Sequence, residues 1–283
     1  MGKDLFGNEI IQDVLLRDKF IEPPFSVLDT KQGNWQRRKK EWMRIGLKSE
    51  IGRDSVVINM DVKSKKNNSA KYVSIFDPAL CEVLYNWFCV DGKEILDPFA
   101  GGSVRGIVAN YLGYKYTGID IRQQQINSNR DQCLNILDVS NQPNYYVGDS
   151  NIVLNEFDKE FDFVFSCPPY ADLEVYSDLE GDISNMPYVE FMKSYEEIIS
   201  KSCKLLKSGG YACFVVGEVR DKKGNYIGFI PDTIRAFRKC GMNYYNEGIL
   251  LNAIASASMR ANGNMKTQKL VKVHQNILIF KKP

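Results

Sequence analysis

The chain has 283 residues, a net charge of +2, and 44% hydrophobic and 25% charged residues, the composition of an ordinary soluble globular protein. No stretch approaches the roughly 18 apolar residues of a membrane span, and the N-terminus lacks the apolar core of a secretory signal. The seven cysteines include no C-x-x-C pair, so we expect neither a metal site nor a disulfide framework, and a reducing cytoplasm fits.

The N-terminal part of the chain is basic. Residues 31–54 carry eight Lys or Arg against three Asp or Glu, and residues 63–71 (KSKKNNSAK) are typical of an exposed linker. Trp35 stands in a cluster that could combine base stacking with phosphate binding, together with Arg37, Arg38, Lys39 and Lys40. The alternative is a helix with a solvated basic face and with Trp35 and Trp42 packed inward. We therefore predict a basic extension over residues 1–75, a candidate for nucleic-acid contact.

From residue 76 onward, short apolar runs alternate with helical patterns, which predicts βαβ units and a parallel sheet in one domain, 76–283. The predicted helices lie near 78–89, 103–113, 122–137, 188–206 and 231–240. The predicted strands lie near 93–97, 115–119, 144–149, 161–166, 211–217, 242–250 and 273–280. The KSGG sequence at 207–210 predicts the end of the fourth helix, because glycine accepts the left-handed conformation found there.

Acidic residues stand at the ends of the first three strands of this domain. Asp97 opens the DPFAGGS turn, whose glycines let a ligand lie against bare backbone at a helix N-terminus. Asp120 follows 23 residues later and could accept hydrogen bonds from both hydroxyls of a ribose, and Asp149 could reach an adenine amino group. The fourth strand, 161–166, ends in Cys-Pro-Pro-Tyr, where the prolines cannot continue the ladder. Open α/β sheets bind ligands at this edge, so we expect a shared crevice.

Two of these motifs resemble those of the S-adenosylmethionine-dependent amino-methyltransferases that act on DNA. DPFAGGS (97–103) is similar to their DPF-x-G-S-G motif, and SCPPY (166–170) is similar to their [Asp/Asn/Ser]-Pro-Pro-[Tyr/Phe/Trp] motif. The resemblance covers about 76–283 and implies a Rossmann-like class I methyltransferase. This is an α/β fold with a mixed, mostly parallel seven-stranded sheet, and its cofactor is S-adenosyl-L-methionine. The compact form resembles phage-type modification enzymes, which implies the cytoplasm of a bacterial or phage-infected host cell.

The resemblance also implies which residues hold the cofactor and which act on the substrate. The methionine end would be shaped by Phe76, Pro78, Asp97, Phe99, Ala100, Gly101 and Gly102. Asp120 would hold the ribose and Asp149 the adenine, with Ile121 and Ser150 beside them. Catalysis would fall to Ser166, Cys167, Pro168, Pro169 and Tyr170.

The exocyclic amine of adenine or cytosine is a poor nucleophile, because its lone pair is delocalised into the ring. Backbone carbonyls held by a Pro-Pro turn are preorganised acceptors for its N–H groups, and Tyr170 can stack on a flipped-out base. Cys167 departs from the family pattern and removes the residue that usually discriminates adenine from cytosine. Three interpretations stay open: the carbonyls do most of the work, Ser166 compensates, or a Cys167 thiolate attacks a pyrimidine ring and opens a route to carbon methylation.

DNA is the partner that the resemblance implies. Fewer than 70 residues separate the two motifs, which leaves no room there for a recognition domain. Recognition would then fall to the basic N-terminal segment, to 171–187, whose acidic residues would repel a phosphate backbone, or to 253–272. The last range contains no acid and suits phosphate contact through Arg260, Lys266, Lys269 and Lys272. The alternatives are an RNA base methyltransferase and a nucleic-acid-binding protein without catalysis.

Overall fold

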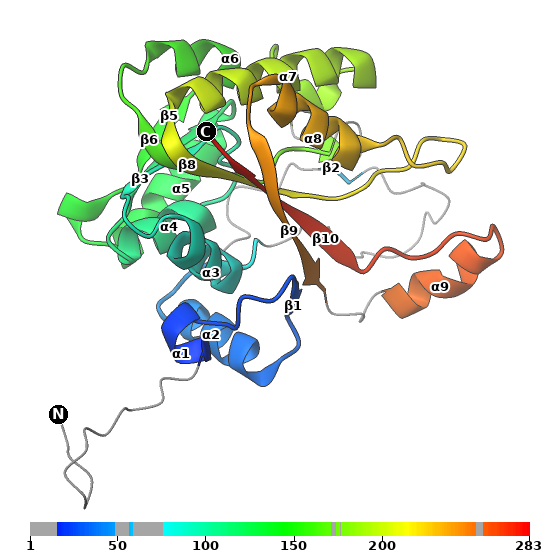
Figure 1. Ribbon diagram of the computed structural model, residues 1–283, viewed down its shortest axis with the longest axis horizontal. Helices are drawn as coiled ribbons and strands as arrows, with labels where there is room; N and C mark the ends of the chain where they lie inside the picture. The colour runs from blue at the N-terminus through cyan, green and yellow to red at the C-terminus, as the bar shows by residue number, and fades with distance from the viewer. Residues whose placement is uncertain (1–15, 49–56, 59–75, 171–173, 176, 253–256) are drawn as a thin grey trace, which may run out of the picture.

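The computed structural model describes residues 16–48, 57–58, 76–170, 174–175, 177–252 and 257–283. Their centre is one eight-stranded sheet with helices on both faces (Figure 1). The strand order is β1-β9-β10-β8-β6-β3-β4-β5. The bounds are β1 (Val27–Asp29), β3 (Glu94–Asp97), β4 (Lys115–Asp120), β5 (Asn144–Val147), β6 (Phe161–Ser166), β8 (Leu206–Val216), β9 (Asn243–Leu251) and β10 (His274–Lys281). Strand β10 is antiparallel to β8 and β9, and the other pairs are parallel.

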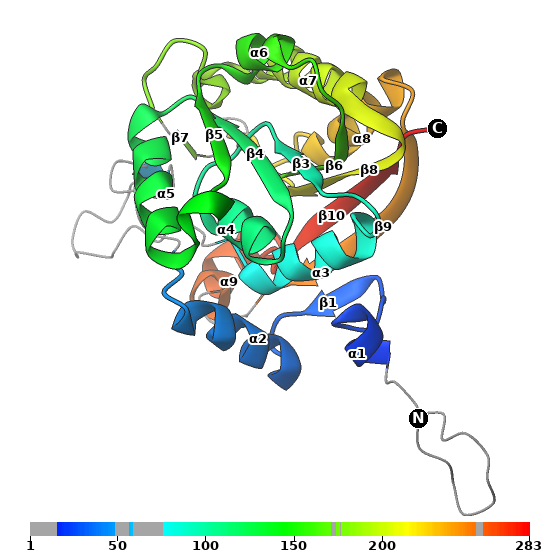
Figure 2. The same cartoon turned by 90° about the vertical axis from the view of Figure 1, so that its left-hand side faces the viewer.

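Helices form a layer on each face of the sheet (Figure 2). One layer contains α3 (Pro78–Phe88), α4 (Val104–Tyr111) and α5 (Gln123–Ile136), and the other contains α6 (Ser150–Val153), α7 (Tyr188–Leu205) and α8 (Phe229–Lys239). Phe163 and Phe165 of β6 pack in the first core and Val164 in the second. Because both faces are buried, the strand is a continuous apolar run rather than an alternating one.

Smaller elements surround these layers. They are α1 (Leu16–Phe20), the 3-10 helices η1 (Val139–Asn141), η2 (Leu154–Glu156) and η4 (Ile183–Asn185), and a short antiparallel pair of β2 (Val57–Ile58) with β7 (Glu174–Val175). None of the described helices has the length and apolar character needed to cross a membrane. Across the described ranges no group of three or more His, Cys, Asp or Glu could hold a metal ion.

The helices and strands predicted for 76–283 are present, but two details of the prediction are wrong. Helix α7 ends at Leu205, and the KSGG sequence lies inside β8 instead of capping the helix. Gly209 has a left-handed φ of +77° and donates its N–H to the Lys282 carbonyl at 3.0 Å, so the glycines form an irregular strand start. The range 253–272, for which no helix was predicted, contains the helix α9 (Ala257–Met265).

The N-terminal segment adds an eighth strand to the sheet, where seven were expected. Strand β1 pairs in parallel with β9, through Val27 opposite Ile249 and the two following residues of each strand. Three residues carry too little pattern to be recognised as a strand from sequence. The segment is therefore joined to the sheet of the α/β domain at its edge.

Helix α2 (Gly33–Arg44) packs against α3 with its tryptophans inward. Trp35 is 1% exposed and Trp42 is 7% exposed, and the indole N–H of Trp42 donates to Glu82 of α3 at 3.1 Å. Arg38 forms an ion pair with the same Glu82. The predicted stacking role of Trp35 is wrong for this arrangement, and the inward-packing alternative is the one observed. Arg37 and Lys40 stay exposed.

Candidate active site

A cavity of about 310 Å³ lies at the carboxyl ends of the parallel strands. Its wall combines the ends of β3 to β6 with residues of β9, β10 and the β1–α2 segment. The predicted cofactor and catalytic residues that line it are Phe76, Phe99, Gly101, Asp120, Ile121, Asp149, Ser150, Cys167, Pro168, Pro169 and Tyr170. Others of the predicted set are not in its lining: Pro78, Asp97, Ala100, Gly102 and Ser166. Residues of both predicted motifs therefore share one cavity.

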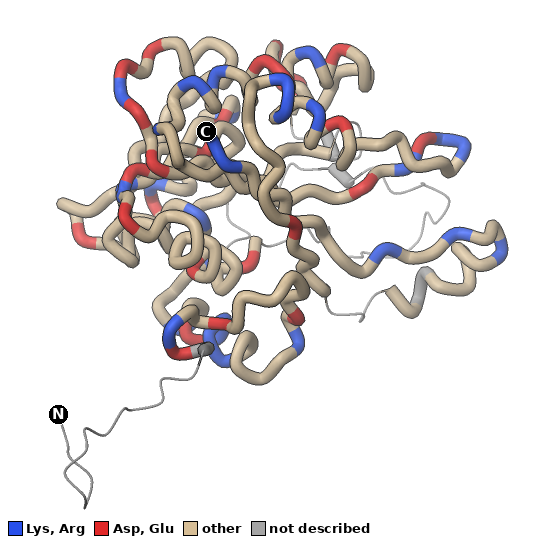
Figure 3. Tube along the Cα trace, in the orientation of Figure 1, with Lys and Arg blue, Asp and Glu red and all other residues tan. Residues whose placement is uncertain are grey.

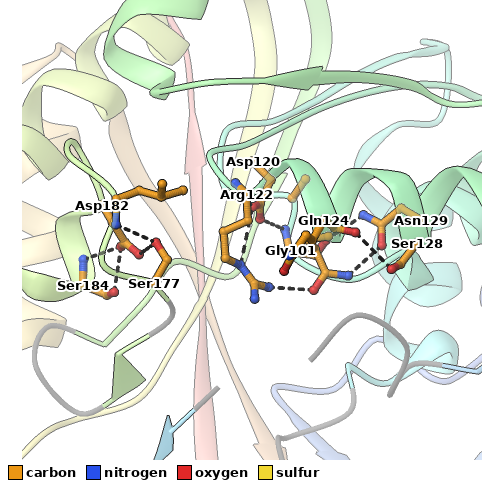
Figure 4. Close-up of polar contacts among 12 residues, drawn as sticks. Gly101, Asp120, Arg122, Gln124, Ser128, Asn129, Ser177, Asp182 and Ser184 are labelled. Atoms are coloured by element: carbon orange, nitrogen blue, oxygen red, sulfur yellow. Dashed lines mark hydrogen bonds and ion pairs between the residues drawn. The ribbon is translucent and has the colours of Figure 1, made fainter. Parts of the chain in front are cut away.

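Asp120 ends β4 and faces the glycine turn that follows β3 (Figure 4). Its Oδ2 accepts a hydrogen bond from the Gly101 N–H at 2.9 Å, and its Oδ1 accepts one from the Arg122 N–H at 2.8 Å. Gly101 has a φ of +51°, a conformation that favours glycine. Burial raises the pKa of Asp120, and the Arg122 guanidinium, 3.9 Å away, opposes this rise. A carboxylate offers about four lone-pair sites, so Asp120 keeps acceptor capacity toward the cavity.

Two further carboxylates lie at the β5 end of the cavity. Asp149 caps α6, and its Oδ1 accepts from the Asn151 N–H at 2.8 Å. Asp182, which carried no motif signal in the sequence, accepts hydrogen bonds from Ser177 Oγ at 2.6 Å and from Ser184 Oγ at 2.7 Å (Figure 4). Gly181, which precedes Asp182 in the chain, has a φ of +88°. A Cβ at this position would lie 3.2 Å from Asp149 Oδ2. The C-terminal part of the acidic range 171–187 thus covers this end of the cavity.

Asp97 lies behind the cavity wall and is fully buried. Arg105 Nε donates to its Oδ2 at 2.5 Å, the Tyr116 hydroxyl donates to the same oxygen at 2.6 Å, and Ser166 Oγ donates to Oδ1 at 2.5 Å. The position of Asp97 differs from the expectation that it shapes the methionine end directly. Ser166 likewise turns its hydroxyl away from the cavity, because Asp97 accepts it. Ser166 is also 0% exposed and does not line the cavity, so its oxygen is not accessible there as a substitute acceptor for Cys167.

Arg105 connects the buried Asp97 to the glycine turn, residues 98–103. Its Nη2 donates to the carbonyls of Phe99 at 2.6 Å and of Ala100 at 2.9 Å. The guanidinium also lies 4.7 Å from the centre of the Phe76 ring and forms part of the cavity wall. The buried ion pair therefore fixes the backbone of the turn that faces the ligand space.

The Cys167–Tyr170 turn follows β6 and presents all four of its residues to the cavity. Cys167 Sγ lies 3.7 Å from the Tyr170 hydroxyl, which also accepts a hydrogen bond from Gln275 Nε2 at 2.7 Å. The Tyr170 ring is 6.1 Å from that of Phe229, and a Cβ at Gly217 would lie 3.3 Å from it. The tyrosine is thus held on several sides. Gln275, on the last strand, carried no signal in the sequence.

Lys and Arg residues lie on two loops at one end of the molecule (Figure 3). Lys222 and Lys223 are exposed in the loop between β8 and α8, and Lys266 is exposed after α9. The loops meet, because a Cβ at Gly224 would lie 2.1 Å from Lys269 Nζ. The predicted contact residue Arg260 belongs to α9, but its side chain lies outside the described part of the structure.

No protein-family model matches this chain, and no curated protein matches its sequence. Among solved structures it is similar to magnesium protoporphyrin IX methyltransferase (ChlM) from Synechocystis PCC 6803 with bound SAH, at 13% identity and a TM-score of 0.50, over 73% of this chain and 83% of that one. The [4+2]-cyclase SpnF gives 16% identity and a TM-score of 0.50, over 73% of this chain and 81% of that one. TrmN from Thermus thermophilus gives 14% identity and a TM-score of 0.48, over 74% of this chain and about half, 49%, of TrmN.

The fold is that of the Rossmann-like class I methyltransferases. The predicted fold class is thereby confirmed, apart from the strand count. At these identities the likeness extends to the fold alone, and a methyltransferase and a cyclase share it. The chemistry of this chain must therefore be argued from its own cavity.

Proposed function

We propose that this protein transfers a methyl group from S-adenosyl-L-methionine to the exocyclic amine of adenine (N6) or cytosine (N4) in DNA. The observation that carries the proposal is the shared cavity, in which Asp120 and Asp149 stand at one end and the Cys167–Tyr170 turn at the other. A methyl donor and an amine acceptor must meet within such a space, since transfer needs both held in line. We assign catalysis to residues 76–283, with the described part of the N-terminal extension completing the cavity.

The residues present fit S-adenosylmethionine. A volume of about 310 Å³ is within the range of roughly 300–1,000 Å³ typical of small-molecule pockets. Asp120 supplies acceptors for a ribose diol, and Asp149 with Asp182 supplies acceptors for an adenine amino group. Ile121 and Ile183 add apolar surface for a purine ring. When bound, this cofactor supplies an electrophilic methyl group.

On the acceptor side, the chain's own residues orient and activate the amine. In this proposal the stiff carbonyls of the Cys167–Tyr170 turn accept hydrogen bonds from its N–H groups and stabilise the positive charge that develops on nitrogen as the N–C bond forms. The methylated nitrogen then releases one of these protons to solvent and becomes neutral. Tyr170, fixed by Gln275 and Phe229, provides a ring for stacking a flipped-out base. The thiol of Cys167 is a weak hydrogen-bonding group, so the carbonyls carry most of this task.

The basic loops support nucleic acid as the substrate. Lys222, Lys223 and Lys266 are exposed, and no ion pair to a carboxylate is seen for them within the described residues. Unpaired lysines of this kind bind phosphates and release counterions. We assign backbone contact to these loops, together with Lys269 and Arg260, and leave Arg37 and Lys40 of α2 as further candidates.

A single labelling assay tests the proposed function. The protein is incubated with methyl-labelled S-adenosylmethionine and with unmethylated DNA, RNA and protein, and the labelled pool is digested. We expect the label in DNA as N6-methyladenine or N4-methylcytosine. Label in RNA would replace the DNA proposal with the RNA one. Cofactor binding without transfer to any pool would favour a binding protein that keeps the fold.

Cys167→Ser should retain methyl transfer within about tenfold of the wild type, because replacing a weakly hydrogen-bonding thiol with a hydroxyl changes the interaction by about 1 kcal/mol. Initial rates on saturating DNA measure this. Cys240→Ser, at a half-buried thiol that does not line the cavity, is the matched control. Complete loss in Cys167→Ser, with a covalent adduct of the wild type on 5-fluorocytosine DNA, would replace amine transfer with the thiolate route.

A further inference from the structure

An ion pair between the N-terminal segment and the α/β domain lies on the cavity wall. Lys39 of α2 places its Nζ 3.2 Å from Oδ2 of Asp77, and both residues line the cavity. The Lys39 side chain is 35% exposed and that of Asp77 is 9% exposed. Thr30 and Gln36 of the same segment also line the cavity. The N-terminal segment therefore contributes a charged wall to the ligand space.

Asp77 is held in place by its neighbours. It caps α3, where Oδ1 accepts from the Ala79 N–H at 3.0 Å, and Oδ2 accepts from the buried indole of Trp35 at 3.2 Å. Trp35 and Lys39 stand one helical turn apart on α2, so the packing of the indole also positions the ammonium. The ammonium has three donors, and Asp77 is the acceptor seen for one of them within the described residues. The pair thus presents a fixed carboxylate and a cation with donors to spare.

The other cations on the cavity wall are tied to different partners. Arg105 gives Nε to Asp97 and Nη2 to two carbonyls of the glycine turn. Arg122 gives Nη2 to Gln125 at 2.6 Å and lies beside Asp120. Lys39 is consequently the cavity cation best able to accept a new anionic partner.

The place of the pair in the cavity defines what it could bind. Asp149 follows β5, Asp120 ends β4 and Gly101 follows β3, and these three strands are neighbours in the sheet. Asp77 lies on the other side of Gly101, because the ring of the adjacent Phe76 packs against Phe165 of β6, the next strand beside β3. A nucleoside bound at Asp149 and Asp120 would point its 5′ substituent toward Gly101 and the pair. An α-amino acid group carries a carboxylate and an ammonium on one carbon, which matches an adjacent cation and anion.

We infer that Lys39 and Asp77 bind the α-amino-acid end of the methyl donor, with Lys39 donating to its carboxylate and Asp77 accepting from its ammonium. This inference rests on the proposed function, because it presumes that the cavity takes S-adenosylmethionine. It assigns Lys39 to cofactor binding rather than to nucleic-acid contact. It also makes the N-terminal segment a necessary part of the cofactor site.

Calorimetric titration with two ligands tests the inference. Wild-type protein should bind S-adenosylmethionine roughly 10- to 100-fold more tightly than decarboxylated S-adenosylmethionine, which lacks the α-carboxylate. Lys39→Met should lose this preference by binding S-adenosylmethionine more weakly while its affinity for the decarboxylated ligand stays unchanged. Unchanged affinity for that ligand also shows that the variant is folded. Lys31→Met, which removes an exposed lysine just before α2 that does not line the cavity, should keep the wild-type preference.

Two results would overturn the inference. One is a Lys39→Met variant that keeps the full preference for the carboxylate. The other is a variant that weakens for both ligands equally, which would indicate a purely structural role for Lys39. Asp120→Asn, at the ribose end, should lower the affinity for both ligands by the same factor. It serves as the reference for an effect that does not depend on the α-carboxylate of the ligand. Failure of the wild type to bind either ligand would instead refute the proposed function.

Discussion

Replacing Arg105 by methionine should lower the free energy of unfolding by about 3–5 kcal/mol, because it leaves a buried carboxylate without its charge partner. Asp97 is 0% exposed and receives Arg105 Nε at 2.5 Å. The same change frees the Phe99 and Ala100 carbonyls from their guanidinium donor. Urea denaturation followed by circular dichroism measures the loss.

Two further variants separate the effect of the uncompensated Asp97 charge from the effect of lost side-chain packing at Arg105. Arg235→Met removes a surface ion pair with Asp232 at 2.7 Å and should cost no more than about 1 kcal/mol. Adding Asp97→Asn to Arg105→Met should recover part of the stability, because the uncompensated charge disappears. An Arg105→Met protein as stable as Arg235→Met would show that the buried pair does not hold the glycine turn.

The structure separates two aspartates that the sequence made equivalent. Asp97 and Asp120 both end a buried strand next to the glycine turn, and that pattern predicted a ligand contact for each. Arg105 stands eight residues after Asp97 and turns back onto it, whereas Asp120 keeps its carboxylate at the cavity. Asp97 is also held in its buried position by Tyr116 and Ser166, whose hydroxyls donate to it from two other strands. Contacts of that range leave no periodic pattern in the sequence.

The strand ends themselves could be predicted, because burial on both faces and the proline and glycine that follow leave a strong local pattern. The cavity residues outside the two motifs could not be predicted. Lys39 stood in a basic run that fits a solvated face equally well, and its role depends on Trp35 packing against Asp77. Gln275 and Asp182 reach the site from the last strand and from a 3-10 turn. Neither position has the spacing of a motif.

Replacing Pro168 and Tyr170 together by alanine should reduce methyl transfer to DNA by roughly 100- to 1,000-fold or more while leaving cofactor affinity unchanged. The alanines relax the turn whose carbonyls are proposed to accept the amine, and they remove the ring that Gln275 and Phe229 hold in place. Asp120 and Asp149 are untouched, so the nucleoside end of the cofactor site remains intact. Single-turnover transfer and calorimetric binding, measured on one preparation, check the two halves of this prediction.

A matched control exists elsewhere in the chain, since Pro187 and Tyr188 stand at the start of α7 and do not line the cavity. Pro187→Ala with Tyr188→Ala makes the same chemical change and should leave transfer near the wild-type rate. If the Pro168 and Tyr170 variant transfers at full rate, the acceptor site lies elsewhere. If both transfer and cofactor binding disappear, the turn supports the whole cavity instead of the amine alone. A turn that holds only the amine predicts loss of transfer with intact cofactor binding. In that variant the methyl donor is still bound, but the acceptor amine is no longer held beside it.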